Sequence, residues 1–140
     1  MKVLYAAHAT ATGEGRNGHG RTSDGLLDLD LATPKEMGGA GGATNPEQLF
    51  AVGYAARFHS ALKVVGRREK VDVDGSTVEA EVGIGPNDQG GFQLQVALTA
   101  TLPHVDQEAA DRIVAAAHQV CPYSNATRGN IDVALRAIGG

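Results

Sequence analysis

The segment from Asn45 to Leu62 constrains the fold of this chain more than any other. Asn45 followed by Pro46 predicts a helix start, because an asparagine side chain accepts from the free N–H groups of a first turn and proline lacks only a donor that would go unused there. The apolar residues that follow lie all round the helix axis, which predicts a helix in the middle of the fold that runs to about Lys70. Arg57 interrupts this surface, and we expect it to need a partner, because an unpaired buried charge is costly.

Composition narrows the class of protein. With 140 residues the chain is long enough for one domain with a core, although it is short enough for a second chain to help complete that core. The net charge of -4 and the lack of a long basic run argue against a nucleic-acid surface. No segment has the pattern of a signal peptide or of a membrane span, and a single cysteine excludes an internal disulfide. We therefore expect a soluble, cytoplasmic protein without a membrane partner.

Alternating apolar residues predict strands on both sides of the central helix. The expected strands are Lys2–Thr10, Leu27–Leu31, Thr77–Ile84, a strand that begins at Phe92 and is ended by Pro103, and Ile131–Ile138. Residues 13–22 form either a weak strand or a loop, and the turn signal at residues 23–25 follows them. Asp106 is the predicted cap of a second helix, and a short turn or helix starts at Pro122. Because strands are grouped before and after helices, the pattern indicates an α+β fold with mainly antiparallel sheet, in a single domain over residues 1–140.

Few residues of this chain are candidates for a reactive or ligand-binding site. Cys121 precedes Pro122, so its sulfur would lie at a helix N-terminus, where the pKa of a thiol falls; the alternative is a small buried hydrophobic residue. Glu47 lies in the first turn of the central helix, where a negative charge is favourable. The histidines lack the close spacing of a zinc helix, and the glycine-rich tract 33–44 lacks the lysine of a phosphate loop, so we expect no metal site and a flexible connector.

Three segments together resemble the organic hydroperoxide resistance proteins of the Ohr and OsmC superfamily. They are Ala9–Gly13, Thr44–Ala51 and Val120–Asn130, and the likeness extends over nearly the whole chain. It implies an OsmC-like fold in which sheets from two subunits wrap two central helices in an intertwined homodimer. It also implies thiol-dependent reduction of organic and lipid hydroperoxides in oxidative-stress defence. The family needs no bound cofactor and is recycled by a dithiol reductant such as a lipoylated protein.

The resemblance also assigns roles to single residues. Arg16 matches the catalytic arginine, Glu47 the glutamate that orients it, and Cys121 the resolving cysteine. An arginine beside sulfur favours the thiolate and binds peroxide oxygens, and two cysteines form a disulfide after one of them is oxidised to a sulfenic acid. Arg57, however, occupies the position of the peroxidatic cysteine. Because a guanidinium is always charged and is no nucleophile, we expect peroxidase activity to be severely impaired, and whether the chain acts as an enzyme stays open.

Several explanations of Arg57 fit the sequence. The substitution is an engineered or natural variant of an active protein, a mark of a paralogue that has given up the chemistry, or a case in which another group has taken over. In a second function class, the chain is a non-catalytic binding module whose Arg57 and Arg16 attract an anionic, fatty-acid-like ligand. In a third, it is a structural dimer in which Arg57 pairs with Glu47, although a buried pair is weak evidence of stability.

Overall fold

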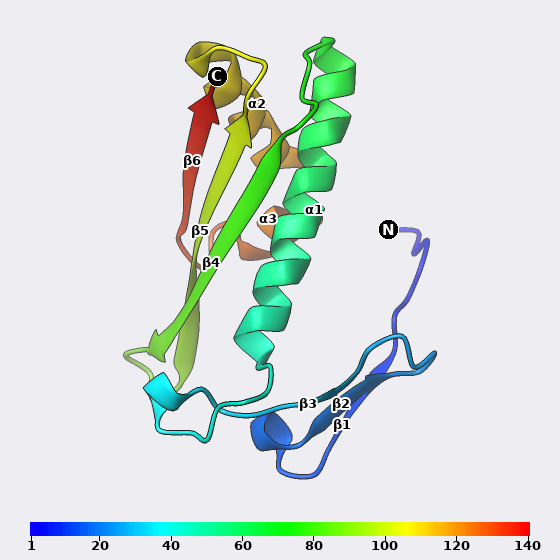
Figure 1. The fold of residues 1–140 in the computed structure, drawn as a ribbon, viewed down its shortest axis with the longest axis vertical. Coiled ribbons are helices and arrows are strands. Elements are labelled where there is room, and N and C mark those ends of the chain that lie inside the picture. Colours follow the sequence, from blue (N-terminus) through cyan, green and yellow to red (C-terminus); the bar gives the residue numbers. More distant parts are fainter. The chain divides into compact units, whose positions relative to one another are not determined.

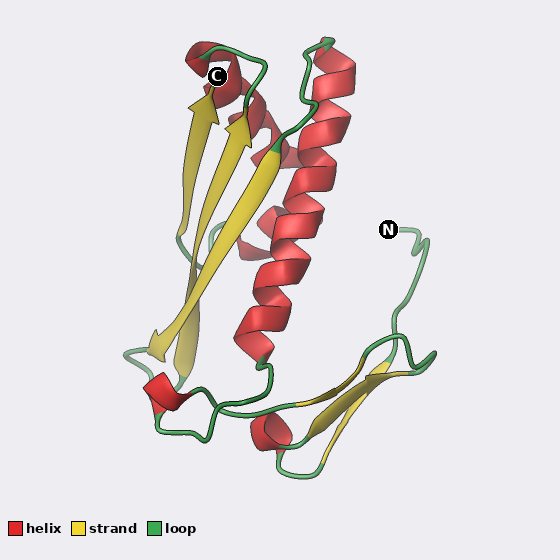
Figure 2. Cartoon of the chain, in the orientation of Figure 1, coloured by secondary structure: helices red, strands yellow, loops and turns green.

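The computed structural model describes all 140 residues, which form two compact units, residues 1–49 and residues 50–140. The first unit holds three short strands and two single-turn 3-10 helices, and the long helix α1 begins at its end. The second unit holds the rest of α1, three strands and two further helices (Figures 1 and 2). In chain order the strands are β1 (Ala9–Thr12), β2 (His19–Thr22), β3 (Asp28–Asp30), β4 (Thr77–Pro86), β5 (Phe92–Leu102) and β6 (Val133–Gly139). The helices are α1 (Pro46–Glu69), α2 (Gln107–Val120) and α3 (Pro122–Thr127).

The first unit is an antiparallel sheet in the order β1-β2-β3. The predicted turn at residues 23–25 is confirmed, because the Leu26 N–H donates to Asp24 Oδ1 and Gly25 adopts a φ of 73°. The predicted first strand is wrong over residues 2–8, since regular pairing starts only at Ala9. β2 ends at Thr22, opposite Ala9, so the residues before Ala9 have no strand beside them.

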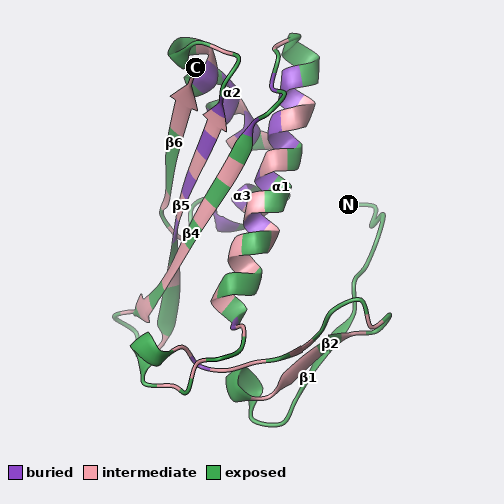
Figure 3. Ribbon diagram, viewed as in Figure 1, coloured by how far each residue is buried: buried purple, intermediate pink, exposed green.

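This sheet has no apolar core of its own. None of the residues of β1, β2 or β3 is buried (Figure 3). Every buried apolar side chain of the protein lies between Tyr54 and Cys121, in the second unit, and the first unit buries only Thr33 and Asn45. A sheet that leaves both faces accessible is typical of a surface that another partner covers.

The second unit is a three-stranded sheet in the order β4-β5-β6, covered on one face by helices (Figure 1). β4 pairs antiparallel with β5, whereas β5 and β6 are parallel and are connected through α2 and α3. Alternate residues of β5 are buried (Val96, Leu98, Ala100 and Leu102), which fits a strand with one covered face. The α+β class and the mainly antiparallel pairing are confirmed, and the one parallel pair arises because a helical crossover separates its strands.

Helix α1 begins and ends as its sequence predicts. The Gln48 N–H donates to Asn45 Oδ1 at 2.8 Å, which confirms the asparagine cap. At the other end Lys70 adopts a φ of 55° and the Val71 N–H donates to the Gly66 carbonyl at 2.9 Å, closing the last turn.

The expectation of burial all round α1 is wrong for the single chain. One stripe faces the sheet, formed by Tyr54, Phe58, Ala61, Leu62 and Val65. Leu49 and Val52 are 39% and 70% exposed. Burial therefore follows only the face of the helix that meets the sheet of its own chain.

Candidate functional site

Arg57 lies on α1, one turn after Gly53, and is exposed. The expectation that it is buried and paired is wrong: the salt bridges of the chain include none from Arg57, and its side chain makes no hydrogen bond within the chain. The physical reason is its position beside the stripe that contains Tyr54 and Phe58, from which a long side chain reaches solvent. The guanidinium is thus free to meet a ligand or another chain.

Cys121 lies at the junction of two helices. It ends α2, where its N–H donates to the Ala117 carbonyl at 2.9 Å, and it caps α3, where Asn125 N–H donates to its carbonyl at 3.0 Å. Pro122 occupies the first turn of α3, as predicted. The thiol is fully buried in the apolar core, so both readings of this residue, helix N-terminus and buried apolar group, describe its place.

Arg16 and Glu47 both belong to the first unit. Arg16 lies in the 3-10 turn Gly15–Asn17 and is exposed, and Glu47 is half-buried in the first turn of α1. Asn17, the residue after Arg16, fixes this turn to the segment at Thr33, because its Oδ1 accepts from the Thr33 N–H at 2.8 Å. The single chain does not join Arg16 to Glu47 in an ion pair, so the orienting role of Glu47 stays a prediction.

A buried hydroxyl network beside Cys121 was not predicted. Ser124 Oγ lies 2.9 Å from Tyr54 Oη and 2.8 Å from His118 Nδ1, so α1, α2 and α3 meet at one hydroxyl. Thr127 Oγ1 lies 3.1 Å from the same Tyr54 oxygen. Burial lowers the pKa of His118 below 6.5, and the positive charge of Arg128 acts in the same direction.

Three aromatic rings pack beside this network. The centroids of Phe50 and Tyr54 are 6.0 Å apart, those of Phe50 and Tyr123 are 6.0 Å apart, and those of Tyr54 and Tyr123 are 5.6 Å apart. Gly53 permits this approach, since a Cβ there would lie only 3.1 Å from Tyr123 Oη. The start of α3 therefore packs on the face of α1 that carries Gly53, and residue 57 lies one turn further along that face.

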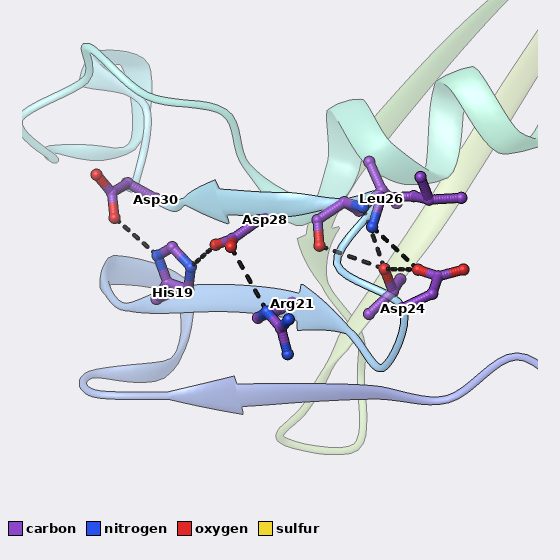
Figure 4. A network of polar contacts seen from close by, with 8 residues as sticks. His19, Arg21, Asp24, Leu26, Asp28 and Asp30 are labelled. Atoms are coloured by element: carbon purple, nitrogen blue, oxygen red, sulfur yellow. Dashed lines mark hydrogen bonds and ion pairs between the residues drawn. The ribbon is translucent and has the colours of Figure 1, made fainter.

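His19 lies between two carboxylates on the polar face of the first sheet (Figure 4). Its Nδ1 is 2.8 Å from Asp30 Oδ1, and its Nε2 contacts Asp28 Oδ1. Arg21 Nε lies 3.5 Å from the other Asp28 oxygen. Hydrogen bonds to Asp30 and then to Asp28 raise the pKa of His19, because both ring nitrogens donate only in the charged form. The sequence pattern predicted the strand Leu27–Leu31, but not this cluster.

The other face of the same sheet is apolar and carries an open hollow of about 270 Å³. Its apolar lining includes Ala9, Ala11, Leu27, Leu29, Leu31 and Leu49. No group of three or more His, Cys, Asp or Glu side chains in the chain is placed to hold a metal ion. No helix is both long and apolar enough to cross a bilayer.

Comparison with known proteins agrees with this fold. The model of the family described as OsmC-like protein matches residues 39–136. An organic hydroperoxide resistance protein of Xanthomonas axonopodis pv. citri is 55% identical over 136 residues, which cover 96% of this chain and 94% of the relative. The structure of the organic hydroperoxide resistance protein OhrB of Bacillus subtilis has a TM-score of 0.87 and 44% identity, covering 96% of this chain and 98% of that one. An organic hydroperoxide resistance protein from Elizabethkingia anophelis has a TM-score of 0.95 and 50% identity, with 100% of both chains covered.

A helix beside a three-stranded sheet, followed by the α2–Cys121–α3 junction, is therefore the arrangement of an OsmC-like protein. The chain belongs to the Ohr/OsmC superfamily, with organic hydroperoxide resistance proteins among its relatives. The family and the OsmC-like α+β fold of the single chain, predicted from the three sequence motifs, are confirmed, and the intertwined homodimer stays a prediction.

Proposed function

We propose that this chain has the scaffold of a thiol-dependent peroxidase that reduces organic and lipid hydroperoxides, and that Arg57 impairs this reaction severely. The observation that carries the proposal is the combination of the family fold with one buried cysteine, Cys121, and an unpaired arginine on α1. The relatives named organic hydroperoxide resistance proteins support the substrate class.

In the proposed reaction a thiolate at position 57 attacks the peroxide O–O bond. The sulfur takes one oxygen and becomes a sulfenic acid, and the other oxygen leaves as the alcohol. The Cys121 thiol then displaces water to form a disulfide, and a dithiol such as a lipoylated protein restores both thiols while itself becoming a disulfide. Arg16 would stabilise the thiolate and the peroxide oxygens, and Glu47 would hold Arg16 in place. No resident cofactor takes part.

The test is steady-state reduction of cumene hydroperoxide with dihydrolipoamide as reductant. We expect turnover in Arg57→Cys and little or none in the chain as it stands. Arg57→Ser is the matched control, because it removes the same guanidinium and supplies a hydroxyl instead of a thiol. Equal turnover in the unchanged chain and in Arg57→Cys would show that the role given to Arg57 is wrong.

We further propose that the protein acts as a homodimer in the cytoplasm. The first unit has no apolar core, its sheet leaves an apolar hollow open, and α1 exposes Val52. An exposed apolar surface of this kind is typical of an interface, and a second copy of the same chain is the partner that is always present to bury it. Sedimentation should give twice the chain mass of 14.4 kDa. Leu29→Glu, on the apolar side of the first sheet, should weaken the dimer, whereas Asp28→Asn on its polar side should not; a 14.4 kDa species for the unchanged chain would contradict the proposal.

One observation favours a second candidate, a binding module for an anionic, fatty-acid-like ligand. The Arg57 guanidinium is exposed and without a carboxylate partner, so it can pair with a ligand carboxylate. Calorimetry with medium-chain fatty acids should then give heat that Arg57→Gln abolishes. Titration that gives no heat above dilution would remove this candidate.

A further inference from the structure

We propose that Ser124, held by Tyr54 and His118, is a positioning residue that fixes Cys121 against the turn of α1 that carries residue 57. This inference deepens the proposed function and rests on it for its meaning, because positioning matters when a thiol at position 57 must meet Cys121. Three helices converge at one buried hydroxyl, that of Ser124.

The location of Ser124 makes it suited to this role. Ser124 lies three residues after Cys121, about one turn along α3, and both are fully buried. Its two hydrogen-bond partners come from different helices, Tyr54 from α1 and His118 from α2. A helix as short as α3 has little stability of its own, so its placement depends on such contacts.

Ser124 Oγ lies between two side chains that can each either donate to it or accept from it. His118 Nδ1, at 2.8 Å, accepts from Ser124 in one neutral tautomer and donates to it in the other, and either hydroxyl of the Tyr54–Ser124 pair, at 2.9 Å, can be the donor. Burial lowers the pKa of His118, so the neutral ring, which can take either role, is favoured near neutral pH. Removing either hydroxyl leaves a buried partner unsatisfied.

The packing of α3 on α1 brings the start of α3 beside the turn of α1 that precedes residue 57. Tyr123, two residues after Cys121, contacts Gly53, and residue 57 lies one helical turn beyond Gly53 on the same face. Tyr54, whose hydroxyl is hydrogen-bonded to Ser124, follows Gly53 on the same turn of α1. A change that loosens Ser124 from Tyr54 therefore loosens Cys121 from residue 57.

The test measures how readily position 57 and Cys121 form a disulfide, without any peroxide. Arg57→Cys is equilibrated with oxidised and reduced dithiothreitol, so that two protein thiols become a disulfide as one dithiothreitol disulfide is reduced. We expect a measurable equilibrium constant, which falls by at least about fivefold when Tyr54→Phe or Ser124→Ala is added, because losing one neutral hydrogen bond accounts for about fivefold and each change removes two.

Two controls separate positioning from loss of stability. Thr99→Val, on the face of β5 opposite its buried residues and in the same Arg57→Cys background, removes a hydroxyl that makes no hydrogen bond within the chain and should leave the constant unchanged. Ile113→Val lowers stability by a similar amount in the same core, at about 0.5–1.5 kcal/mol, and should also leave it unchanged. Circular dichroism verifies that each variant is folded.

The outcomes distinguish this inference from the proposed function. Failure of Arg57→Cys to form any disulfide, or a constant unaffected by both Tyr54→Phe and Ser124→Ala, would overturn the positioning role. A constant that falls in those two variants alone supports it, even if Arg57→Cys reduces no cumene hydroperoxide. That last result would refute the peroxidase proposal by itself.

Discussion

Asn45→Ala removes the cap of α1, and we expect it to destabilise the protein more than the matching change at α2. The Gln48 N–H donates to Asn45 Oδ1 at 2.8 Å, and the Ala109 N–H donates to Asp106 Oδ1 at the same 2.8 Å. The two caps differ in exposure, since Asn45 is 8% exposed whereas Asp106 is exposed. Water can replace the lost acceptor at Asp106 far more easily than at Asn45.

The magnitudes follow from this difference. Replacing a cap by alanine costs about 0.5–2 kcal/mol, and the loss lies toward the upper end where the capping bond is partly buried, as at Asn45, and toward the middle where it is exposed, as at Asp106. We therefore expect Asn45→Ala to lower the free energy of unfolding by about 2 kcal/mol, and Asp106→Ala by about 1 kcal/mol.

Urea denaturation followed by circular dichroism measures both changes at one protein concentration, so that any association contributes equally. Asn45→Asp is the matched control, because it retains an oxygen acceptor and should stay within about 0.5 kcal/mol of the unchanged chain. An Asn45→Ala protein that loses no more stability than Asp106→Ala would refute the argument from burial.

Three further predictions concern pH and packing. Because Asp30 and Asp28 raise the pKa of His19, the contribution of His19 to stability is fully present below pH 6.5 and is lost as pH rises through the folded pKa. His19→Gln should remove this pH-dependent fall from a profile of melting temperature against pH. An unchanged profile would contradict the prediction. Burial lowers the pKa of His59, so stability should fall as pH drops below 6.5 and level off beneath the folded pKa; His59→Gln should flatten this fall, and an equally steep fall would count against the assignment. Phe58→Ala, at a fully buried ring, should cost about 3–5 kcal/mol in urea unfolding, and a loss below about 1 kcal/mol would place Phe58 outside the core.

Local signals in the sequence predicted the local structure well. Three residues favour a helix start by their own chemistry, and a helix begins at each of them in the structure: Asn45, Asp106 and Pro122. Alternation likewise predicted the hairpin of β4 and β5. These features depend on neighbours a few residues away, which a sequence displays directly.

Features that depend on distant residues were not predictable in the same way. Tyr54 and Ser124 are 70 residues apart in the chain, and neither a tyrosine nor a serine by itself predicts a buried hydrogen-bond network. Apolar residues all round α1 predicted burial on every side, yet Val52 is 70% exposed, because the sheet of one chain covers only one face. The exposure of Arg57 has the same origin. The apolar pattern of α1 is that of a helix packed on more faces than the sheet of a single chain covers.

The most direct test of the account is the rate of cumene hydroperoxide reduction by the unchanged chain and by Arg57→Cys, with dihydrolipoamide as reductant. We expect turnover only when residue 57 carries a thiol, and we expect Arg57→Ser to be as inactive as the unchanged chain. Turnover by the unchanged chain at the rate of Arg57→Cys would contradict it, because Cys121 alone would then support the whole cycle.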